Sequence, residues 1–137
     1  MELLPVSLRI AGSWVLVVGG GAVARRKAQV LLRAGARVRL VAPRVDDELR
    51  ALLQTPRHEV LERQFQDNDL CDVALVVAAT DDQTLNERLH ALARAQRLPV
   101  NVVDQPALCT FIFPSIIERA PLTVAVTSGG AAPLLSR

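Results

Sequence analysis

Aromatic side chains make up only 3% of this chain, and tyrosine is absent. Without tyrosine, no mechanism can relay a proton through a tyrosine–lysine pair. Only two cysteines occur, Cys71 and Cys109, and they lie far apart with no metal-ligand spacing around them. We therefore expect no bound metal. The cysteines are expected to be small core residues of a protein in a reducing compartment, the cytoplasm.

Long apolar runs and clusters of positive charge are missing as well. No apolar stretch approaches the roughly 18 residues that a transmembrane helix needs. The first five residues lack the basic region of a signal peptide. The net charge is only +2, and no run of basic residues is interleaved with aromatic ones. We expect neither a membrane nor a nucleic acid as a partner.

Aliphatic residues are what the chain has in abundance. Half of its 137 residues are hydrophobic and 22% are charged, which is typical of about one globular domain. Valine, leucine and alanine dominate. This composition favours an α/β core whose parallel strands are buried on both faces.

A glycine-rich segment follows the first strongly apolar run, residues 15–18. Its spacing, Gly19-x-Gly21-x-x-Ala24, is that of a dinucleotide-binding fingerprint with alanine in the third place. Gly19 permits a tight turn, Gly21 lets a pyrophosphate approach the backbone, and Ala24 lets the helix pack on the strand. The N-terminus of that helix favours an anion. The alternative is a strand-to-helix turn that holds no ligand.

Strand and helix patterns alternate along the first 110 residues, which predicts βαβ units. The predicted strands are 6–10 (a short edge strand), 14–18, 37–41, 58–61, 73–79 and 99–103, and the predicted helices are 22–34, 46–53 and one that ends near 97. We expect an α/β fold: a Rossmann-like, doubly wound parallel sheet over residues 1–110. Residues 111–137 differ. They predict strands at 111–113, 115–118 and 122–127, then the start of a helix from 131.

The segment after the second predicted strand departs from the usual dinucleotide pattern. An acidic residue that binds the adenosine ribose is expected about 20 residues beyond the glycines. Pro43 and Arg44 stand there instead, and Asp46 and Asp47 are expected to open the next helix. Arg44 either meets a 2′-phosphate, stacks on adenine or is solvated. The residues alone thus leave NAD and NADP as alternatives.

Polar residues follow two further strands at the edge where such folds bind ligands. Asp104 comes after an apolar strand that contains Asn101. It is either a general base, a carboxylate that holds a cationic substrate nitrogen, or a turn residue. Thr80 and Asp81 follow the strand 73–79, and one of them is expected to cap the next helix.

Basic residues and one serine complete the set of candidates. Arg25, Arg26 and Lys27 follow the glycines and either recognise carboxylates or are solvated on the helix face. Ser128 precedes two glycines and the predicted helix from 131. Its default role is an N-cap, and contact with an anion is the alternative.

Four groups of residues, taken in order, resemble the N-terminal module of the siroheme synthase family. They are residues 19–24 with Arg26 and Lys27, residues 78–82 with Asn86, residues 101–104 followed by 111–115, and residues 121–122 with 128–130. Their order and spacing agree over nearly the whole chain. The family comprises precorrin-2 dehydrogenases, many of which are also sirohydrochlorin ferrochelatases.

The resemblance implies that the module binds NAD and oxidises precorrin-2 to sirohydrochlorin, and that bifunctional members then insert ferrous iron. Asp104 matches the family's essential aspartate, a general acid/base. The resemblance also implies cofactor contacts at Ala22, Val23, Pro43 and Arg44. We further expect cofactor contacts at Gly19, Gly20, Gly21, Thr80 and Asp81, and substrate contacts at Arg25, Asn101, Arg119 and Ser128. Ser128 matches the family's phosphorylatable serine, where added charge would repel a substrate with eight carboxylates.

The sequence also departs from the family. The family continues beyond position 137 with helices that complete a dimerisation region, so residues 111–137 are expected to be only its start. The chain is either truncated or a degenerate copy, and a homodimer is expected of the full-length form. Ala22 replaces a common acidic residue. The rival interpretation is a non-catalytic module that binds and senses NAD.

Overall fold

The computed structural model describes residues 1–128. Contacts between residues divide the chain into two compact units. The larger unit is Leu8–Thr110, and the smaller one combines Met1–Ser7 with the chain from Phe111 onward. The predicted helix from residue 131 lies outside the described residues.

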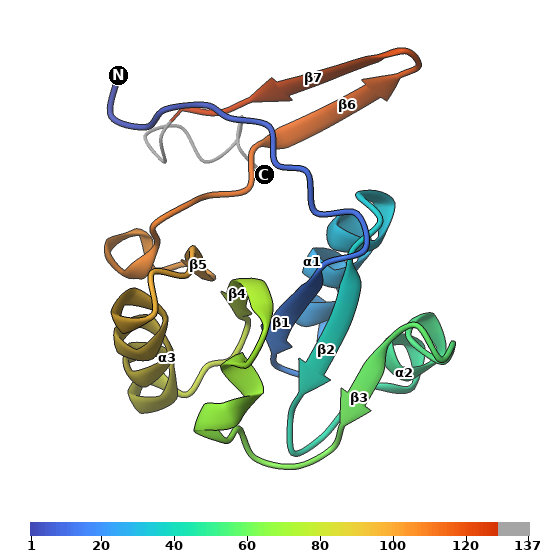
Figure 1. Ribbon diagram of the computed structural model, residues 1–137, viewed down its shortest axis with the longest axis vertical. Coiled ribbons are helices and arrows are strands. Elements are labelled where there is room, and N and C mark those ends of the chain that lie inside the picture. Colours follow the sequence, from blue (N-terminus) through green and yellow to red (C-terminus); the bar gives the residue numbers. More distant parts are fainter. Residues whose placement is uncertain (129–137) are drawn as a thin grey trace. The chain divides into compact units, whose positions relative to one another are not determined.

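The larger unit is built on a parallel sheet with the strand order β3-β2-β1-β4-β5, visible from right to left in Figure 1. In chain order the strands are β1 (Trp14–Val18), β2 (Arg37–Val41), β3 (Glu59–Leu61), β4 (Val73–Ala78) and β5 (Val100–Val102). The chain leaves β1 in one direction toward β2 and later returns to its other side at β4. The order of the strands therefore reverses between β1 and β4, which is where doubly wound sheets bind ligands.

Helices make the crossovers between the parallel strands. They are α1 (Ala22–Arg33), α2 (Asp47–Leu52) and α3 (Gln83–Ala95), with short 3-10 turns η1 (Asp67–Leu70) and η2 (Pro106–Leu108). Because right-handed crossovers in opposite directions place helices on opposite faces, α1 and α2 cover one face of the sheet and α3 covers the other. The expected Rossmann-like fold is confirmed.

The core explains the apolar pattern of the sequence. Leu16 and Val18 of β1 belong to a buried cluster with Leu89 and Ala93 of α3. Val15 and Val17 alternate with them and face the other side, where α1 buries Ala24, Ala28 and Leu31. The first of these α1 residues is the alanine of the glycine fingerprint. Its full burial confirms that the helix packs closely on the sheet at this position.

Two predicted strands do not form. Residues 6–10 alternate apolar and polar side chains as an edge strand would, yet Val6 is 68% exposed and the sheet ends at β3 and β5 without them. Residues 111–113 are also irregular, although the rings of Phe111 and Phe113 contact each other with centroids 5.4 Å apart. Residues 6–10 do alternate and residues 111–113 are all apolar, but neither segment pairs with a strand of the described residues.

The smaller unit contains an antiparallel pair of strands, β6 (Ser115–Arg119) and β7 (Leu122–Val126). Ile117 lies opposite Val124 in the register, and each of these side chains is 50% exposed. Directly opposed residues lie on the same side of a two-stranded sheet. The hairpin therefore presents apolar side chains that its own unit leaves uncovered.

Candidate functional site

Backbone hydrogen bonds join the chain segments at the carboxyl ends of four neighbouring strands. Gly19 N donates to Val41 O at 3.0 Å at the end of β2, and Ala79 N donates to Val18 O at 2.7 Å at the end of β1. Val103 N donates to Ala78 O at 3.0 Å. The segments that follow β2, β1, β4 and β5 therefore lie side by side along one edge of the sheet.

The glycine loop fits tightly against its neighbours at two positions. Gly19 has a φ of +137°, and a Cβ there would overlap the carbonyl oxygen of Ala79. A Cβ at Gly20 would overlap the carbonyl oxygen of Arg44. Neither residue can become alanine without a backbone shift, so both glycines are required by the fold of the loop itself.

Gly21 is different, because a Cβ there would meet no protein atom within 4 Å. Its side faces open space at the start of α1, whose N-terminus has no side-chain cap and no acidic residue in its first turn. Backbone N–H groups of this kind attract an anion. The loop thus fits the pyrophosphate of a dinucleotide, with Ala22 exposed and Val23 half-buried beside it.

The segment after β2 is held against the glycine loop by its backbone. Asp46 N donates to Gly20 O at 2.8 Å, and Pro43 and Arg44 are exposed just before it. Asp46 is the N-cap residue of α2, which begins at Asp47, as the sequence predicts. The Arg44 side chain is therefore at the site edge, and no carboxylate takes the usual ribose-binding place.

The segment after β4 differs from the prediction in its cap. The N-cap of α3 is Asp82, whose Oδ1 accepts a hydrogen bond from Leu85 N at 3.1 Å, and not Thr80 or Asp81. Thr80 Oγ1 instead accepts a hydrogen bond from Asp82 N at 2.8 Å. The helix therefore begins after Asp82, one residue later than a cap at Asp81 would place it. Asp81 is left exposed at the edge of the sheet.

Asn86, one of the residues that carry the family resemblance, is buried. Only 1% of it is exposed, and its Nδ2 donates to Thr80 O at 2.9 Å. Asn86 thus fixes the turn at Thr80 beside the glycine loop. The sequence shows that Asn86 lies one turn into α3, but the direction of its side chain follows only from the packing of the helix.

Asp104 occupies an exposed tight turn after β5. Its φ of +62° lies in the left-handed region, which Asp tolerates better than most residues. Gln105 N donates to Val102 O at 3.1 Å across the turn. Asn101 is buried within β5, three residues before Asp104. The structure thus holds an exposed carboxylate at the same edge of the sheet as the glycine loop.

Cys109 and Lys27 belong to the surroundings of this turn, a role that sequence reasoning missed. Val102 N donates to Cys109 Sγ at 3.2 Å, and Sγ lies 3.1 Å from Val102 O. Burial lowers the pKa of the Lys27 ammonium, as does Arg26, whereas the nearby Asp104 and Cys109 raise the pKa. The separations of 77 and 82 positions in the sequence gave no signal that these charges influence Lys27.

The predicted substrate contacts come from both units of the chain. The Arg25 guanidinium pairs with the carboxylate of Glu48 on α2. Arg119 and Ser128 belong to the smaller unit, where Arg119 Nη1 donates to Glu118 O at 2.9 Å. Their roles toward a substrate stay predictions.

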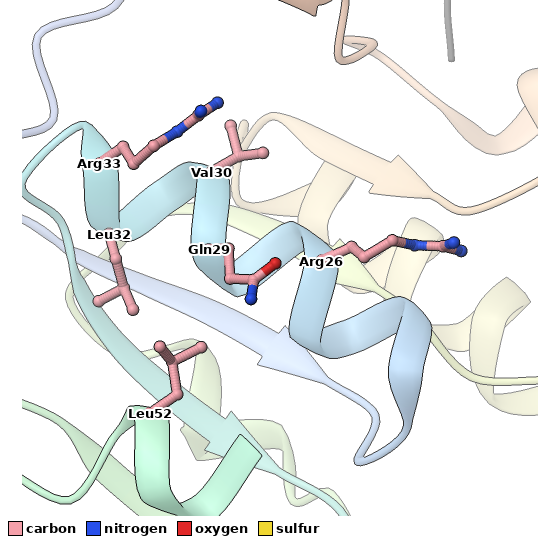
Figure 2. A pocket seen from close by; sticks show the side chains of 6 residues that line it. All are labelled: Arg26, Gln29, Val30, Leu32, Arg33 and Leu52. Carbon is pink, nitrogen blue, oxygen red and sulfur yellow. The ribbon is translucent and has the colours of Figure 1, made fainter. Parts of the chain in front are cut away.

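A hollow between α1 and α2 is separate from these residues. It is lined by Arg26, Gln29, Val30, Leu32, Arg33 and Leu52, and Figure 2 shows Leu32 and Leu52 pointing toward each other. Of the candidate residues named from the sequence, Arg26 lines it, but none of the predicted cofactor or substrate contacts does. Over residues 1–128, no three His, Cys, Asp or Glu side chains group as a metal site would need. No helix in that range is long and apolar enough to cross a membrane.

Comparisons with known proteins agree with this geometry. A family described as "Putative NAD(P)-binding" matches residues 6–115. Siroheme synthases from Pseudomonas paraeruginosa (strain DSM 24068 / PA7) and Pseudomonas entomophila (strain L48) are 53% and 55% identical over all 137 residues. The chain spans 30% of the length of each.

A solved structure of SirC, a precorrin-2 dehydrogenase, is also similar. It superposes with a TM-score of 0.82 at 31% identity, over 98% of this chain and 66% of that one. With a family match over most of the chain and these relatives, the chain belongs to the siroheme synthase and precorrin-2 dehydrogenase family of NAD(P)-binding proteins.

Proposed function

We propose that this chain is an NAD-dependent dehydrogenase that oxidises precorrin-2 to sirohydrochlorin. The observation that carries the proposal is the exposed Asp104 carboxylate at the same sheet edge as the open Gly21 loop. The likeness to SirC and to the siroheme synthases supports the substrate. We take the cofactor to be NAD, as the family resemblance implies. Pro43 and Arg44 stand where a ribose-binding carboxylate is usual, but they do not exclude NAD.

The reaction removes two electrons and two hydrogen nuclei from the substrate. Bound NAD supplies the acceptor for one hydride. The other hydrogen leaves as a proton, which the Asp104 carboxylate accepts and passes to solvent. The products are sirohydrochlorin, NADH and one proton. Gly19, Gly20 and Gly21 shape the loop for the pyrophosphate, and Ala22, Val23, Thr80 and Asp81 are the proposed contacts on either side of it.

A tetrapyrrole with eight carboxylates requires positive charge near the site. Arg25 and Arg119 are the proposed partners, with Asn101 as a polar contact. Arg25 must exchange its ion pair with Glu48 for a substrate carboxylate, which is a small cost for a partly solvated pair. Phosphorylation at Ser128 would add like charge and weaken substrate binding.

Insertion of ferrous iron into sirohydrochlorin is proposed as a second activity of the same site. The pyrrole nitrogens of the substrate bind the iron, and their two protons must leave. Asp104 is the proposed acceptor for these protons. The exposed carboxylate of Asp104 supports this proposal, because one carboxylate can accept the protons released in both reactions. Iron insertion that persists in Asp104→Asn would refute this shared role.

We further propose that residues 111–137 begin a dimerisation region and that the full-length form is a homodimer. The apolar pair Ile117 and Val124, each half exposed on one side of the hairpin, supports a second copy as the covering partner. The cytoplasm is the proposed location, because Cys71 and Cys109 are free thiols. No nucleic acid is proposed as a partner.

The test is steady-state oxidation of precorrin-2 with NAD under anaerobic conditions, followed by NADH formation and the sirohydrochlorin spectrum. We expect turnover by the native chain. Tight NAD binding without turnover, both in this chain and in one extended beyond Arg137, would overturn the proposal. That result would favour the rival function, a module that senses NAD.

A further inference from the structure

Asp46 begins a helix without capping it through its side chain. It is the N-cap residue of α2, yet its carboxylate accepts no hydrogen bond from the backbone of that helix. Asp46 is exposed, and its carboxylate forms no hydrogen bond or ion pair with any of residues 1–128. Aspartate is favoured at an N-cap chiefly because its oxygens accept such bonds. The position at the start of α2 therefore leaves this carboxylate available to a ligand.

The glutamates of the same part of the chain are already paired with arginines. Between residues 42 and 62 the pairs are Glu48 with Arg25, Glu59 with Arg39, and Glu62 with Arg50. The two remaining acidic residues there are Asp46 and Asp47, both exposed. They differ in what the backbone of each one contacts.

The backbone folds Asp46 back onto the glycine loop. Asp46 N donates to Gly20 O at 2.8 Å, and a Cβ at Gly20 would overlap the carbonyl oxygen of Arg44. Val45, between these two contacts, is buried. The turn of residues 44–46 thus packs around the middle glycine of the loop that fits the pyrophosphate. Because an aspartate side chain is short, this backbone contact keeps the Asp46 carboxylate near the loop.

The place of Asp46 corresponds to the adenosine half of a dinucleotide. In doubly wound sheets an acidic residue that follows the second strand binds the 2′-hydroxyl of the adenosine ribose, which is bonded directly to the pyrophosphate. Pro43 and Arg44 occupy the usual place, and Asp46 is the next carboxylate along the chain. A carboxylate accepts strong hydrogen bonds from hydroxyl groups and repels a phosphate.

Arg44 favours the opposite selectivity, because a guanidinium attracts a 2′-phosphate. The local charge decides between the two. A phosphate monoester carries about 1.5 to 2 negative charges at neutral pH. It would lie near the carboxylates of Asp46 and Asp47 with Arg44 as the one exposed cation of residues 42–47. A ribose with its hydroxyl groups unmodified brings no such repulsion.

We propose that Asp46 binds the adenosine ribose and makes the site select NAD over NADP. From the start of α2 it takes the role that a carboxylate at the end of the second strand has in other dinucleotide-binding sheets. The inference rests on the cofactor site of the proposed dehydrogenase. It does not depend on precorrin-2 as the substrate, so binding measurements alone decide it.

The first test is calorimetric titration of the native chain with NAD and with NADP, without precorrin-2. We expect NAD to bind about tenfold or more tightly than NADP. Asp46→Ala should weaken NAD binding about tenfold and strengthen NADP binding, because a hydrogen-bond acceptor and a negative charge are both lost. Asp47→Ala, which removes the same charge one position along, should leave the preference for NAD nearly unchanged.

The second test removes the ribose hydroxyl from the ligand instead of the carboxylate from the protein. We expect the native chain to bind the 2′-deoxyadenosine analogue of NAD about tenfold more weakly than NAD, and Asp46→Ala to bind the two about equally. Asp46→Asn should regain part of the NAD affinity, because its amide oxygen still accepts a hydrogen bond. Equal thermal unfolding midpoints in the native chain and Asp46→Asn show that this comparison is not one of folding.

Three results would overturn the role of Asp46. One is equal affinity of the native chain for NAD and NADP, which would favour Arg44 as a phosphate contact. The second is an equal loss of NAD affinity in Asp46→Ala and Asp47→Ala. The third is additive losses when carboxylate and ribose hydroxyl are both removed. A native chain that binds no NAD would overturn the proposed dehydrogenase as well, whereas NAD binding that Asp46→Ala leaves unchanged would overturn this inference alone.

Discussion

Asp104 has an unfavourable backbone conformation that a glycine would relieve. Left-handed φ costs an ordinary L-residue about 1 to 2 kcal/mol, and Asp somewhat less. We predict that Asp104→Gly raises the free energy of unfolding by up to about 1 kcal/mol while abolishing precorrin-2 oxidation. Denaturant unfolding measures the first effect. A destabilised Asp104→Gly would show that the carboxylate itself contributes more to stability than the strain costs.

Two adjacent glycines in the loop are predicted to behave differently. Gly20→Ala should destabilise the chain, by about 1 to 3 kcal/mol, because its Cβ would overlap the carbonyl oxygen of Arg44. Gly21→Ala should fold normally, since its Cβ meets no protein atom, but weaken NAD binding because the pyrophosphate occupies that space. Thermal unfolding and calorimetric titration with NAD separate the two. Normal NAD affinity in Gly21→Ala would contradict the proposed place of the pyrophosphate.

At the scale of elements, the pairing of β2 with β3 brings His58 close to Val38, whose N–H donates to its Nδ1 at 3.1 Å. Burial, followed by the charges of Arg57 and Arg37, lowers the pKa of His58 below the ordinary 6.5. The unfolded chain therefore binds a proton at a higher pH than the folded chain does. Stability should be full above about pH 6.5 and fall as the pH drops below it.

We predict that His58→Ala flattens this fall and costs about 1 kcal/mol at neutral pH through the lost hydrogen bond. The measurement is the midpoint of thermal unfolding between about pH 5 and about pH 8, the range in which histidine titrates. An identical pH dependence in the native chain and His58→Ala would assign the effect to another group.

Most elements of the larger unit follow from local pattern. The apolar run of β4 and the 3.6-residue period of α3 fixed both elements to within a few residues, because each buries a continuous face. The pattern failed where pairing decides the outcome: residues 6–10 alternate like a strand but find no partner. The cap at Asp82 was missed by one position because Thr80 forms its own turn.

The candidate site was predictable only in part. The glycine spacing and the exposed Asp104 follow from sequence, since strand ends meet at one edge of a parallel sheet. The close approach of Gly20 to the carbonyl oxygen of Arg44 depends on how the loops after β1 and β2 pack against each other. Contacts between residues so far apart in the chain leave no trace in spacing.

At the scale of the whole molecule, the uncovered face of the β6–β7 hairpin predicts self-association. Ile117 and Val124 are opposed on one side of it. We predict that the native chain dimerises with rising concentration and that Val124→Lys shifts it to monomer, because a buried lysine would lack a partner. Sedimentation equilibrium measures the shift, with Thr123→Lys on the other side of β7 as the control. A native chain that stays monomeric at high concentration would contradict a dimerisation role for this hairpin.

The central claim is that Asp104 and the glycine loop act together on one bound pair of substrate and cofactor. The most direct measurement is an anaerobic single turnover of precorrin-2 with NAD, comparing the native chain with Asp104→Asn, a variant that keeps the shape and tolerates the left-handed turn. We predict one NADH per sirohydrochlorin in the native chain, and a loss of about 100-fold or more in rate with unchanged NAD affinity in the variant. Equal rates in the two proteins would contradict the account.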